Sequence, residues 1–287
     1  MGTGEEPAAE TAGEARPLGP ETREIAQSAA VAGTRRLQRP VLGEAITGLI
    51  GGLSIGFGAV AMAAVGGLVS DFAGRSAGML AASLAFPVGF VILLIGKAEL
   101  FTENFLVPVI GVFERRGTPL NLGRVWSVSL AANLLGAFIF AWLISRHGVL
   151  SPQASSYLRR LGPEKVSNPF WTSFTKAIFA GWLMTILTWL LLACETIGQR
   201  LAIIWMTGAL IIVGDFNHSV ISAAESFIAI NLGAQLTYGQ WFLHNLIPAV
   251  LGNMVGGVLF VTALFYLQHN ALERSSSIRD AQEGRRR

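Results

Sequence analysis

Residues 96–104 read GKAELFTEN and interrupt an apolar segment that otherwise runs from about residue 79 to residue 114. Three ionisable side chains, Lys97, Glu99 and Glu103, stand within seven residues of this stretch. Charged groups at membrane depth are costly and usually mark a functional site. Non-helical backbone is tolerated there only where protein buries it or where it lines a cavity. The stretch therefore predicts a helix that is broken inside a membrane for a functional reason.

A second apolar segment, at about 200–230, is interrupted in the same manner. Residues 214–219 read GDFNHS and have apolar runs on both sides. About 20 apolar residues span a bilayer, so each of these two segments is too long for one ordinary span. Interrupted helices at corresponding places in two halves of a chain indicate a substrate path near the membrane midplane.

The composition places the whole chain in lipid. Of its 287 residues, 52% are hydrophobic and 14% are charged, with a mean hydropathy of +0.53, whereas soluble domains carry roughly 25% charge. A net charge of +3 is explained by arginines that anchor loops at the bilayer surface rather than by nucleic-acid binding. The sequence predicts an all-α integral membrane protein with six transmembrane helices, at about 42–70, 79–114, 125–146, 170–194, 200–230 and 241–268.

We expect three regions along the chain. Residues 1–41 are predicted to be a cytoplasmic, largely disordered tail, residues 42–268 a six-helix pore domain, and residues 269–287 a basic cytoplasmic tail. With six spans both termini face one side, which carries fourteen of the 21 Lys and Arg residues against five on the opposite side. Basic residues favour the cytoplasmic side. We therefore expect a multi-pass protein of the cell (inner) membrane with both termini in the cytoplasm.

Two halves of the chain carry related patterns. Residues 133–137 read NLLGA and residues 253–257 read NMVGG, an offset of 120, while Thr102 and Asn217 in the two interruptions differ by 115. Three spans per half insert the second copy upside down, so the patterns predict a 3+3 inverted repeat in which helices 2 and 5 are the broken ones. Small-residue patterns also recur in helical membrane proteins that have no repeat.

Several motifs together resemble the formate/nitrite transporter family. They are AELFTEN at 98–104, NHS at 217–219, the run from Lys176 to Trp189, and GNMVGG at 252–257. The similarity extends from about residue 40 to residue 268 and is to a less characterised branch. The resemblance implies an aquaporin-like fold, a homopentamer with one pore in each subunit, and passage of small monovalent anions such as formate, nitrite or hydrosulfide, often together with a proton.

The resemblance also implies roles for polar residues. Thr102 matches the threonine of the broken second helix, and His218 matches the central pore histidine. Lys165 falls on a lysine of the outer vestibule, where Lys176 is a second candidate. A solvated loop position is an equal alternative for Lys165, and for Lys176 we favour a side chain that snorkels to the membrane interface.

Six further residues are assigned to the substrate pore by the resemblance: Phe86, Phe90, Phe101, Gly181, Ile211 and Asn217. Phe86 and Phe90 fall near the apolar constrictions, and Ile211 lines the other wall. Gly181 stands where the family usually has an asparagine, and Asn217 stands where an acid often precedes the histidine. These two departures affect the expected choice of anion rather than the fold.

The chemistry explains why a histidine suits the centre of such a pore. A bare anion cannot cross apolar constrictions cheaply, and protonation turns a weak-acid anion into a small neutral molecule. Histidine is the side chain that most readily exchanges a proton near neutral pH. His218 is therefore the candidate donor or polarising group. A core histidine bonded only to Thr102 or to a carbonyl is the alternative.

The acidic residues need another explanation, because a carboxylate repels an anion. We expect Glu99 and Glu103 to be structural, bonded to loop amides or, for Glu99, paired with Lys97 or with another helix. Asn104 is predicted to cap the following half-helix rather than to touch the anion. Glu225 either relays protons to the cytoplasm or pairs with a polar group between subunits, and the pairing between subunits is favoured.

Three other functions stay open. A water or glycerol channel would carry paired Asn-Pro-Ala caps, and the sequence has no such tripeptide. A transport-inactive assembly or sensing protein is the second. A metalloenzyme is the third, and it is disfavoured because the acidic candidates are accompanied by one histidine and no metal motif: Glu99, Glu103, Asp215, His218 and Glu225. We therefore expect no enzymatic activity, no metal and no cofactor.

Overall fold

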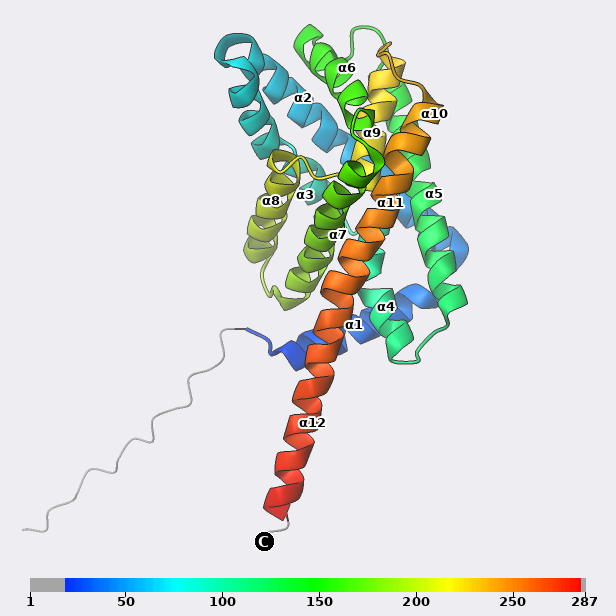
Figure 1. Ribbon diagram of the computed structural model, residues 1–287, viewed down its shortest axis with the longest axis vertical. Coiled ribbons are helices and arrows are strands. Elements are labelled where there is room, and N and C mark those ends of the chain that lie inside the picture. The colour runs from blue at the N-terminus through cyan, green and yellow to red at the C-terminus, as the bar shows by residue number, and fades with distance from the viewer. Residues whose placement is uncertain (1–18, 285–287) are drawn as a thin grey trace, which may run out of the picture.

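The computed structural model describes residues 19–284, and over that range the chain is helical with no strand (Figure 1). This agrees with the all-α prediction. In chain order the elements are α1 (Thr22–Leu37), α2 (Val41–Ala85), α3 (Pro87–Ile95), the 3-10 turn η1 (Phe101–Phe105), α4 (Val107–Phe113), α5 (Pro119–Ile144), α6 (Pro152–Val166), α7 (Phe170–Ala193), α8 (Ile197–Val213), α9 (Ser219–Asn231), α10 (Tyr238–Trp241), the π-helical η2 (Phe242–Leu246), α11 (Ile247–Met254), the π-helical η3 (Val255–Ala263) and α12 (Leu264–Gly284).

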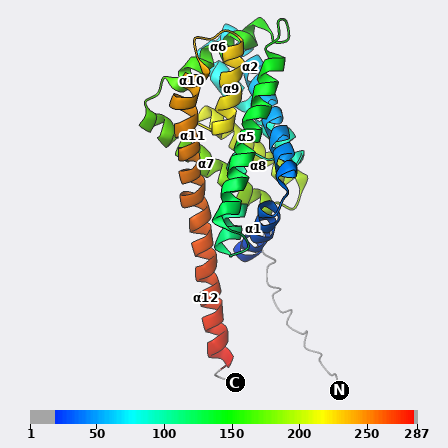
Figure 2. The same ribbon diagram turned by 90° about the vertical axis from the view of Figure 1, so that its right-hand side faces the viewer.

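The segment before the first apolar region is helical rather than disordered. Residues Thr22–Leu37 form α1, whose buried Ile25 and Ala29 pack in one cluster with Val107 and Ile110 of α4. The expectation of a largely disordered tail up to residue 41 is therefore wrong for α1, because this amphipathic stretch has an apolar face to bury. Residues 1–18 and 285–287 lie outside the described residues. At the other end α12 projects beyond the bundle (Figure 2).

Four helical segments within residues 19–284 are long and apolar enough to cross a membrane: Val41–Ile95, Pro119–Ile144, Phe170–Ala193 and Tyr238–Leu272. Three shorter apolar segments accompany them: Phe101–Phe113, Ile197–Val213 and Ser219–Asn231. The first long segment reverses direction at Gly74, whose φ of 84° suits glycine (Figure 1). These lengths indicate a chain that passes through the membrane several times.

Non-helical backbone separates α3 from α4, and α8 from α9, and both separations begin with the same turn. Lys97 and Asp215 adopt left-handed backbone, with φ of 62° and 48°. The amide that follows each of them donates to the carbonyl five residues earlier, at 3.0 Å in both cases: Ala98 to Leu93, and Phe216 to Ile211. This pattern satisfies the last carbonyls of a helix that stops.

Asn133 of α5 holds the backbone that follows α3. Its Nδ2 donates to the carbonyls of Gly48 at 2.7 Å and Glu99 at 2.9 Å, and its Oδ1 accepts from the amide of Phe101 at 2.7 Å. The side chain is fully buried. One amide group thus ties α2, α5 and the start of η1 together and supplies partners that the broken helix lacks.

Asn253 of α11 does the same for the backbone that follows α8. Its Nδ2 donates to the carbonyls of Ala177 at 2.8 Å and Asn217 at 2.9 Å, and its Oδ1 accepts from the amide of Ser219 at 3.0 Å. It is also fully buried. The two asparagines therefore make the same three contacts with a neighbouring helix, with the loop and with the first residue after the loop.

The matched contacts fix which residues of the two breaks correspond. Glu99 corresponds to Asn217 and Phe101 to Ser219, and both pairs are 118 residues apart. The sequence comparison had set Thr102 against Asn217 at an offset of 115, and the contacts correct this by three residues. Thr102 and His218 are therefore not equivalent positions: the first follows its clamped amide, and the second precedes it.

We expect Asn253→Ala to lower the free energy of unfolding by about 2 to 4 kcal/mol, because the carbonyl of Asn217 and the amide of Ser219 lose a buried partner at roughly 1–3 kcal/mol each. Asn253→Asp should lose at least as much, because the oxygen that replaces Nδ2 faces the carbonyls of Ala177 and Asn217 in a fully buried site. Thr47→Ala is the control, because that hydroxyl bonds only to the Gly43 carbonyl of its own helix, at 2.8 Å. Equal thermal stability of N253A and T47A in detergent would contradict the clamp.

Candidate functional site

His218 and Thr102 meet between the two breaks. Thr102 Oγ1 lies 2.8 Å from His218 Nε2, and both residues are buried, at 0% and 1% exposure. His218 is also the N-cap of α9: its Nδ1 accepts from the amides of Val220 and Ile221, each at 3.2 Å. With Nδ1 accepting, a neutral ring carries its proton on Nε2 and donates it to Thr102.

This arrangement limits what the histidine can do. A proton on Nδ1 would face the two backbone N–H groups that now donate to it, and both hydrogen bonds would be lost. The ring therefore presents one free function, the Nε2–H, toward Thr102. A small polar molecule that enters between these two side chains meets a hydrogen-bond donor on one side and a hydroxyl on the other.

Aromatic and aliphatic side chains surround this polar pair. The Phe90 ring centroid lies 6.4 Å from the His218 ring, and the Phe86 ring lies 5.3 Å beyond Phe90 in an edge-on contact. Both phenylalanines are fully buried, and Ile211 is 1% exposed. The structure thus brings Phe86, Phe90 and His218 together in one row of ring contacts, with the phenylalanines on the α3 side; their place in a pore stays a prediction.

Phe101 is buried in η1, where its ring meets Phe105 at 4.8 Å and its amide is held by Asn133. It stands next to Thr102 in the chain, so its backbone positions the hydroxyl that reaches His218.

Gly181 serves a helix crossing. A Cβ there would overlap the carbonyl of Asn253, just as a Cβ on Gly52 would overlap the carbonyl of Asn133. An asparagine side chain therefore has no room at Gly181. The assignment of this residue to the pore wall is corrected, because close approach of α7 to α11 requires the glycine.

Asn217 forms a neutral polar network behind His218. Its Nδ2 donates to Ser173 Oγ at 2.7 Å, and its Oδ1 accepts from Asn245 Nδ2 at 3.2 Å. Asn245 also accepts from Ser222 Oγ at 2.7 Å. All the partners are buried. The network fixes the side chain of Asn217 away from Thr102, which is bonded to His218 instead.

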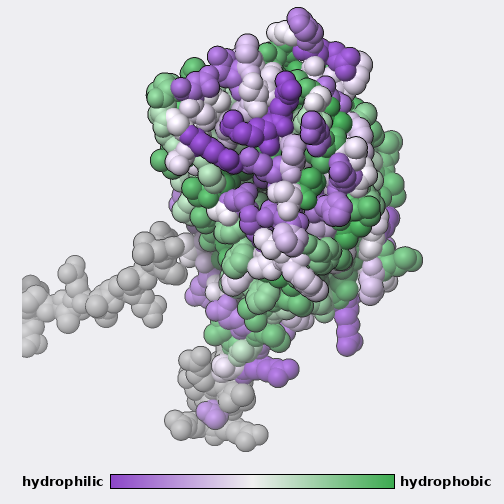
Figure 3. Space-filling model, turned by 45° about the horizontal axis from the view of Figure 1, so that its top comes forward, coloured by the Kyte–Doolittle hydropathy of each residue, from purple (hydrophilic) through white to green (hydrophobic). Residues whose placement is uncertain are grey.

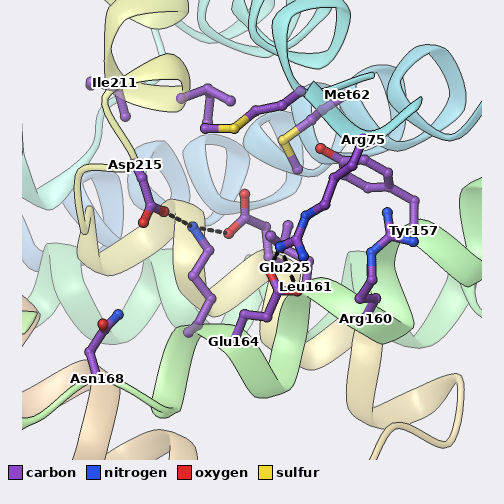
Figure 4. A pocket seen from close by; sticks show the side chains of 13 residues that line it. Met62, Arg75, Tyr157, Arg160, Leu161, Glu164, Asn168, Ile211, Asp215 and Glu225 are labelled. Carbon is purple, nitrogen blue, oxygen red and sulfur yellow. Dashed lines mark hydrogen bonds and ion pairs between the residues drawn. The ribbon is translucent and has the colours of Figure 1, made fainter. Parts of the chain in front are cut away.

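Charged side chains gather at the end of the molecule where α6 lies, here called the α6 end. Lys165 Nζ lies 3.3 Å from Glu225 Oε2 and 3.8 Å from Asp215 Oδ1. Lys176 pairs with the other oxygen of Asp215, so it does not simply snorkel. Lys165 thus has a carboxylate on either hand, those of Asp215 and Glu225, which Figure 4 shows at the same cavity. Figure 3 shows hydrophilic residues at this end above a hydrophobic flank.

The two carboxylates hold Lys165 charged. Burial on its own would lower the pKa of Lys165, but the carboxylates of Glu225 and Asp215 outweigh it and raise the pKa above the ordinary lysine value. The stability linked to this shift of the Lys165 pKa is present at neutral pH and is lost as the pH rises through the raised pKa. The interpretation of Lys165 as a solvated loop residue is wrong.

A cavity of about 170 Å³ opens at the α6 end. Ile211 and Met62 form part of its apolar wall, and Lys165, Asp215 and Glu225 form part of its polar wall (Figure 4). Ile211 lines this cavity, and its role in a pore wall stays a prediction. Glu225 pairs with Lys165 of its own chain, whereas the favoured expectation was a partner in a neighbouring subunit.

At the opposite end, the α1 end, Glu99 is held by Arg36 of α1 and by Arg39, which follows α1. Arg39 binds both carboxylate oxygens of Glu99 at 2.9 Å, and Arg36 Nε lies 3.3 Å from the same group. Arg36 also lies 3.7 Å from Glu103 and donates to Asn104 Oδ1 at 2.9 Å. Glu99 therefore pairs with another helix and not with Lys97.

Glu103 and Asn104 complete this cluster in different ways. Glu103 Oε1 accepts from the amide of Leu100 at 2.8 Å, as predicted for a structural carboxylate. Asn104 was expected to cap α4, but α4 has no side-chain cap. The amide of Asn104 is turned toward Arg36 instead, because α1 docks on this break.

The sequence interpretation did not identify Arg36, Arg39 and Asn245 as site residues. Arg36 lies in the last turn of α1 and Arg39 lies beyond its end, so no shared helix face signalled this pair. No pattern in the sequence signalled Asn245, because this residue lies in the π-helical η2, which turns its side chain out of the regular helical register. Within residues 19–284, no three His, Cys, Asp or Glu residues form a group that could hold a metal ion.

Lys165→Met should lower the free energy of unfolding by about 3 kcal/mol or more, because it leaves the fully buried Glu225 without its counter-charge. Adding Glu225→Leu should restore most of that loss. Lys97→Met is the control, because Lys97 is exposed. Thermal unfolding in detergent measures the cycle, and additive effects of the two changes would show that the pair is not coupled.

Comparison with known proteins adds three findings. The sequence model of the "Formate/nitrite transporter" family matches residues 23–267. The "Probable formate transporter" of Methanothermobacter thermautotrophicus is 31% identical over 248 residues, covering 80% of this chain and 90% of that protein. The "Inner membrane protein YfdC" of Escherichia coli (strain K12) is 26% identical, covering 89% of this chain and 80% of that protein.

Solved structures have the same fold. An "FNT family ion channel" superposes with a TM-score of 0.78 at 20% identity, covering 85% of this chain and 98% of that chain. A "Pentameric formate channel with formate bound" superposes with a TM-score of 0.65 at 22% identity, covering 80% and 97%. These relatives are channels and transporters rather than enzymes. Since the family's sequence model matches most of its length, the chain belongs to the formate/nitrite transporter family.

Proposed function

We propose that this protein is a membrane pore for small monovalent weak-acid anions, formate first among them, with nitrite and hydrosulfide as further candidates. The observation that carries the proposal is the buried contact of Thr102 Oγ1 with His218 Nε2, 2.8 Å long, with Phe90 against the histidine. A polar pair enclosed by apolar rings is what a small dipole needs at the centre of a membrane. The names of the relatives support formate as the first substrate to test.

In the proposed mechanism, the species that crosses the apolar section of the pore is the neutral acid rather than the anion. A charge passing Phe86 and Phe90 without a partner would meet a large desolvation barrier, whereas the neutral acid would not. His218 is a hydrogen-bond donor in this step rather than the proton source, because release of the Nε2 proton from a neutral ring would leave an imidazolate. The anion therefore takes its proton from hydronium in the solvent at the pore entrance, which leaves water, and His218 and Thr102 bind the neutral acid in transit.

The architecture that we propose around this pore is the 3+3 inverted repeat. The equal contacts of Asn133 and Asn253 support it, since two copies of one motif would clamp two breaks in the same way. We further propose a homopentamer in the cell (inner) membrane with both termini in the cytoplasm. The pentameric relative supports the assembly, the name of the Escherichia coli relative supports the membrane, and the excess of arginines supports the orientation.

Replacing His218 tests the mechanism. His218→Asn should keep the N-cap of α9, because asparagine is a good capping residue, but it removes the ring donor. Loss of one such bond in a dry site costs roughly 1.5–3 kcal/mol, so formate flux into proteoliposomes should fall by about tenfold or more. His218→Phe should abolish flux. His147→Phe, an exposed histidine outside the row of ring contacts, is the control.

The pH dependence tests the neutral-acid step. Formate uptake should rise as the pH falls on the side from which formate enters, because more of it is then protonated at the pore entrance. Chloride, which stays ionised, should not follow this dependence. Full flux through H218N, or a chloride conductance equal to formate flux at every pH, would contradict the proposed function.

A further inference from the structure

The charges around the cavity of the α6 end cancel almost completely. Arg75 Nη2 binds both carboxylate oxygens of Glu164, at 2.8 and 2.9 Å. Lys165 pairs with Glu225, and Lys176 pairs with Asp215. Each of the three carboxylates that line the cavity therefore has a base of its own: Glu164, Asp215 and Glu225.

Arg160 stands apart from these pairs. It lines the same cavity from α6, is exposed, and has no carboxylate within ion-pair distance among residues 19–284. Its guanidinium carbon lies 5.4 Å from the ring centroid of Tyr157, one turn earlier on the helix. Figure 4 shows Arg160 and Tyr157 together on one side of the cavity, with Asp215 across from them. Lys176 pairs with Asp215 from outside the cavity lining, so Arg160 is the one base lining the cavity that has no ion-pair partner among residues 19–284.

We propose that Arg160, with Tyr157 beside it, is the site that captures a small monovalent oxyanion or monocarboxylate at the α6 end before it enters the pore. The inference rests on the proposed function and assigns its first binding step to residues other than Lys165. A guanidinium and a phenol hydroxyl offer several donors to one carboxylate, and such charge-assisted bonds are stronger than neutral ones. The aromatic ring orients the guanidinium by a cation–π contact.

Lys165 is poorly placed for this capture. Its ammonium already lies between two carboxylates, and to meet an anion it would have to leave Glu225, which is 0% exposed. Separating a buried ion pair leaves an uncompensated charge and is strongly unfavourable. Lys165 therefore neutralises the wall of the cavity, and Arg160 supplies the net attraction.

Tyr157 suits the role of second donor. Burial raises the pKa of the Tyr157 phenol, and the nearby carboxylate of Glu225 raises it further, so the hydroxyl keeps its proton over the whole physiological range. The cavity, at about 170 Å³, has room for a small anion together with several waters. Beyond it, Ile211 and Met62 form apolar wall where a charged anion would lose its hydration. Capture therefore precedes protonation and entry.

The test compares Arg160→Gln with Arg159→Gln. Arg159 is the next residue on α6, is equally exposed, and does not line the cavity. The measurements are initial rates of formate uptake into proteoliposomes and equilibrium dialysis of labelled formate against the detergent-solubilised full chain. R160Q should raise the KM for formate by about fivefold, the weight of one exposed charge contact, with kcat within twofold. Formate binding should weaken by the same factor, and R159Q should match the wild type.

The outcomes separate this inference from the proposed function. Equal KM and equal formate binding in R160Q, R159Q and the wild type would overturn the capture site while leaving the transport function intact. Formate binding that depends on Arg160 in a wild-type protein without formate flux would support the site and overturn the function. Tyr157→Phe gives a second check, since it keeps the ring under the guanidinium and should raise KM less than R160Q. A larger effect of Y157F on kcat than on KM would contradict the assignment.

Discussion

The constraint on which this structure depends is that broken backbone in a membrane must find its hydrogen-bond partners inside the protein. Asn133 and Asn253 meet it with one side chain each. Each of these two asparagines donates to two carbonyls and accepts from one amide. Both the amide nitrogen and the amide oxygen of the side chain are thus hydrogen-bonded to backbone. Without these contacts the loops at residues 96–100 and 214–218 would have to be closed into helix or be exposed to water.

The same clamps determine where the candidate site lies. Asn253 holds the carbonyl of Asn217 and the amide of Ser219, the groups on either side of His218. Asn133 holds the amide of Phe101, directly before Thr102. The bond of 2.8 Å between His218 and Thr102 is therefore the contact between two separately clamped loops. A site built in this way is rigid without any helix running through it, which suits a pathway that must stay open along its axis.

The sequence was sufficient for the parts of the fold that depend on local composition. Apolar length indicated the helices, and the charges of GKAELFTEN and GDFNHS indicated the two breaks, with Thr102 and His218 in them. It was not sufficient where a partner lies far away along the chain. Arg39 and Glu99 are 60 residues apart, and α1 docks on the break because its apolar face, its Arg36 and the Arg39 that follows it all fit there. Gly181 shows the same limit. A glycine is required there because the backbone of Asn253, 72 positions later in the chain, leaves no room for a side chain.

Carboxylates lie beside a proposed anion path, and basic side chains neutralise them. The basic side chains come from different parts of the fold at the two ends of the molecule. At the α6 end, Glu225 and Asp215 are matched by Lys165 and Lys176, which flank the cavity itself. At the α1 end, Glu99 and Glu103 are matched by Arg36 and Arg39, of which Arg36 belongs to α1, packed on α4, and Arg39 follows that helix. Neutralisation at the second break thus comes from residues around the cavity, whereas at the first break it comes from α1 and the residues just after it. The helix that composition alone assigned to a disordered tail is in this way part of the electrostatics of the pore.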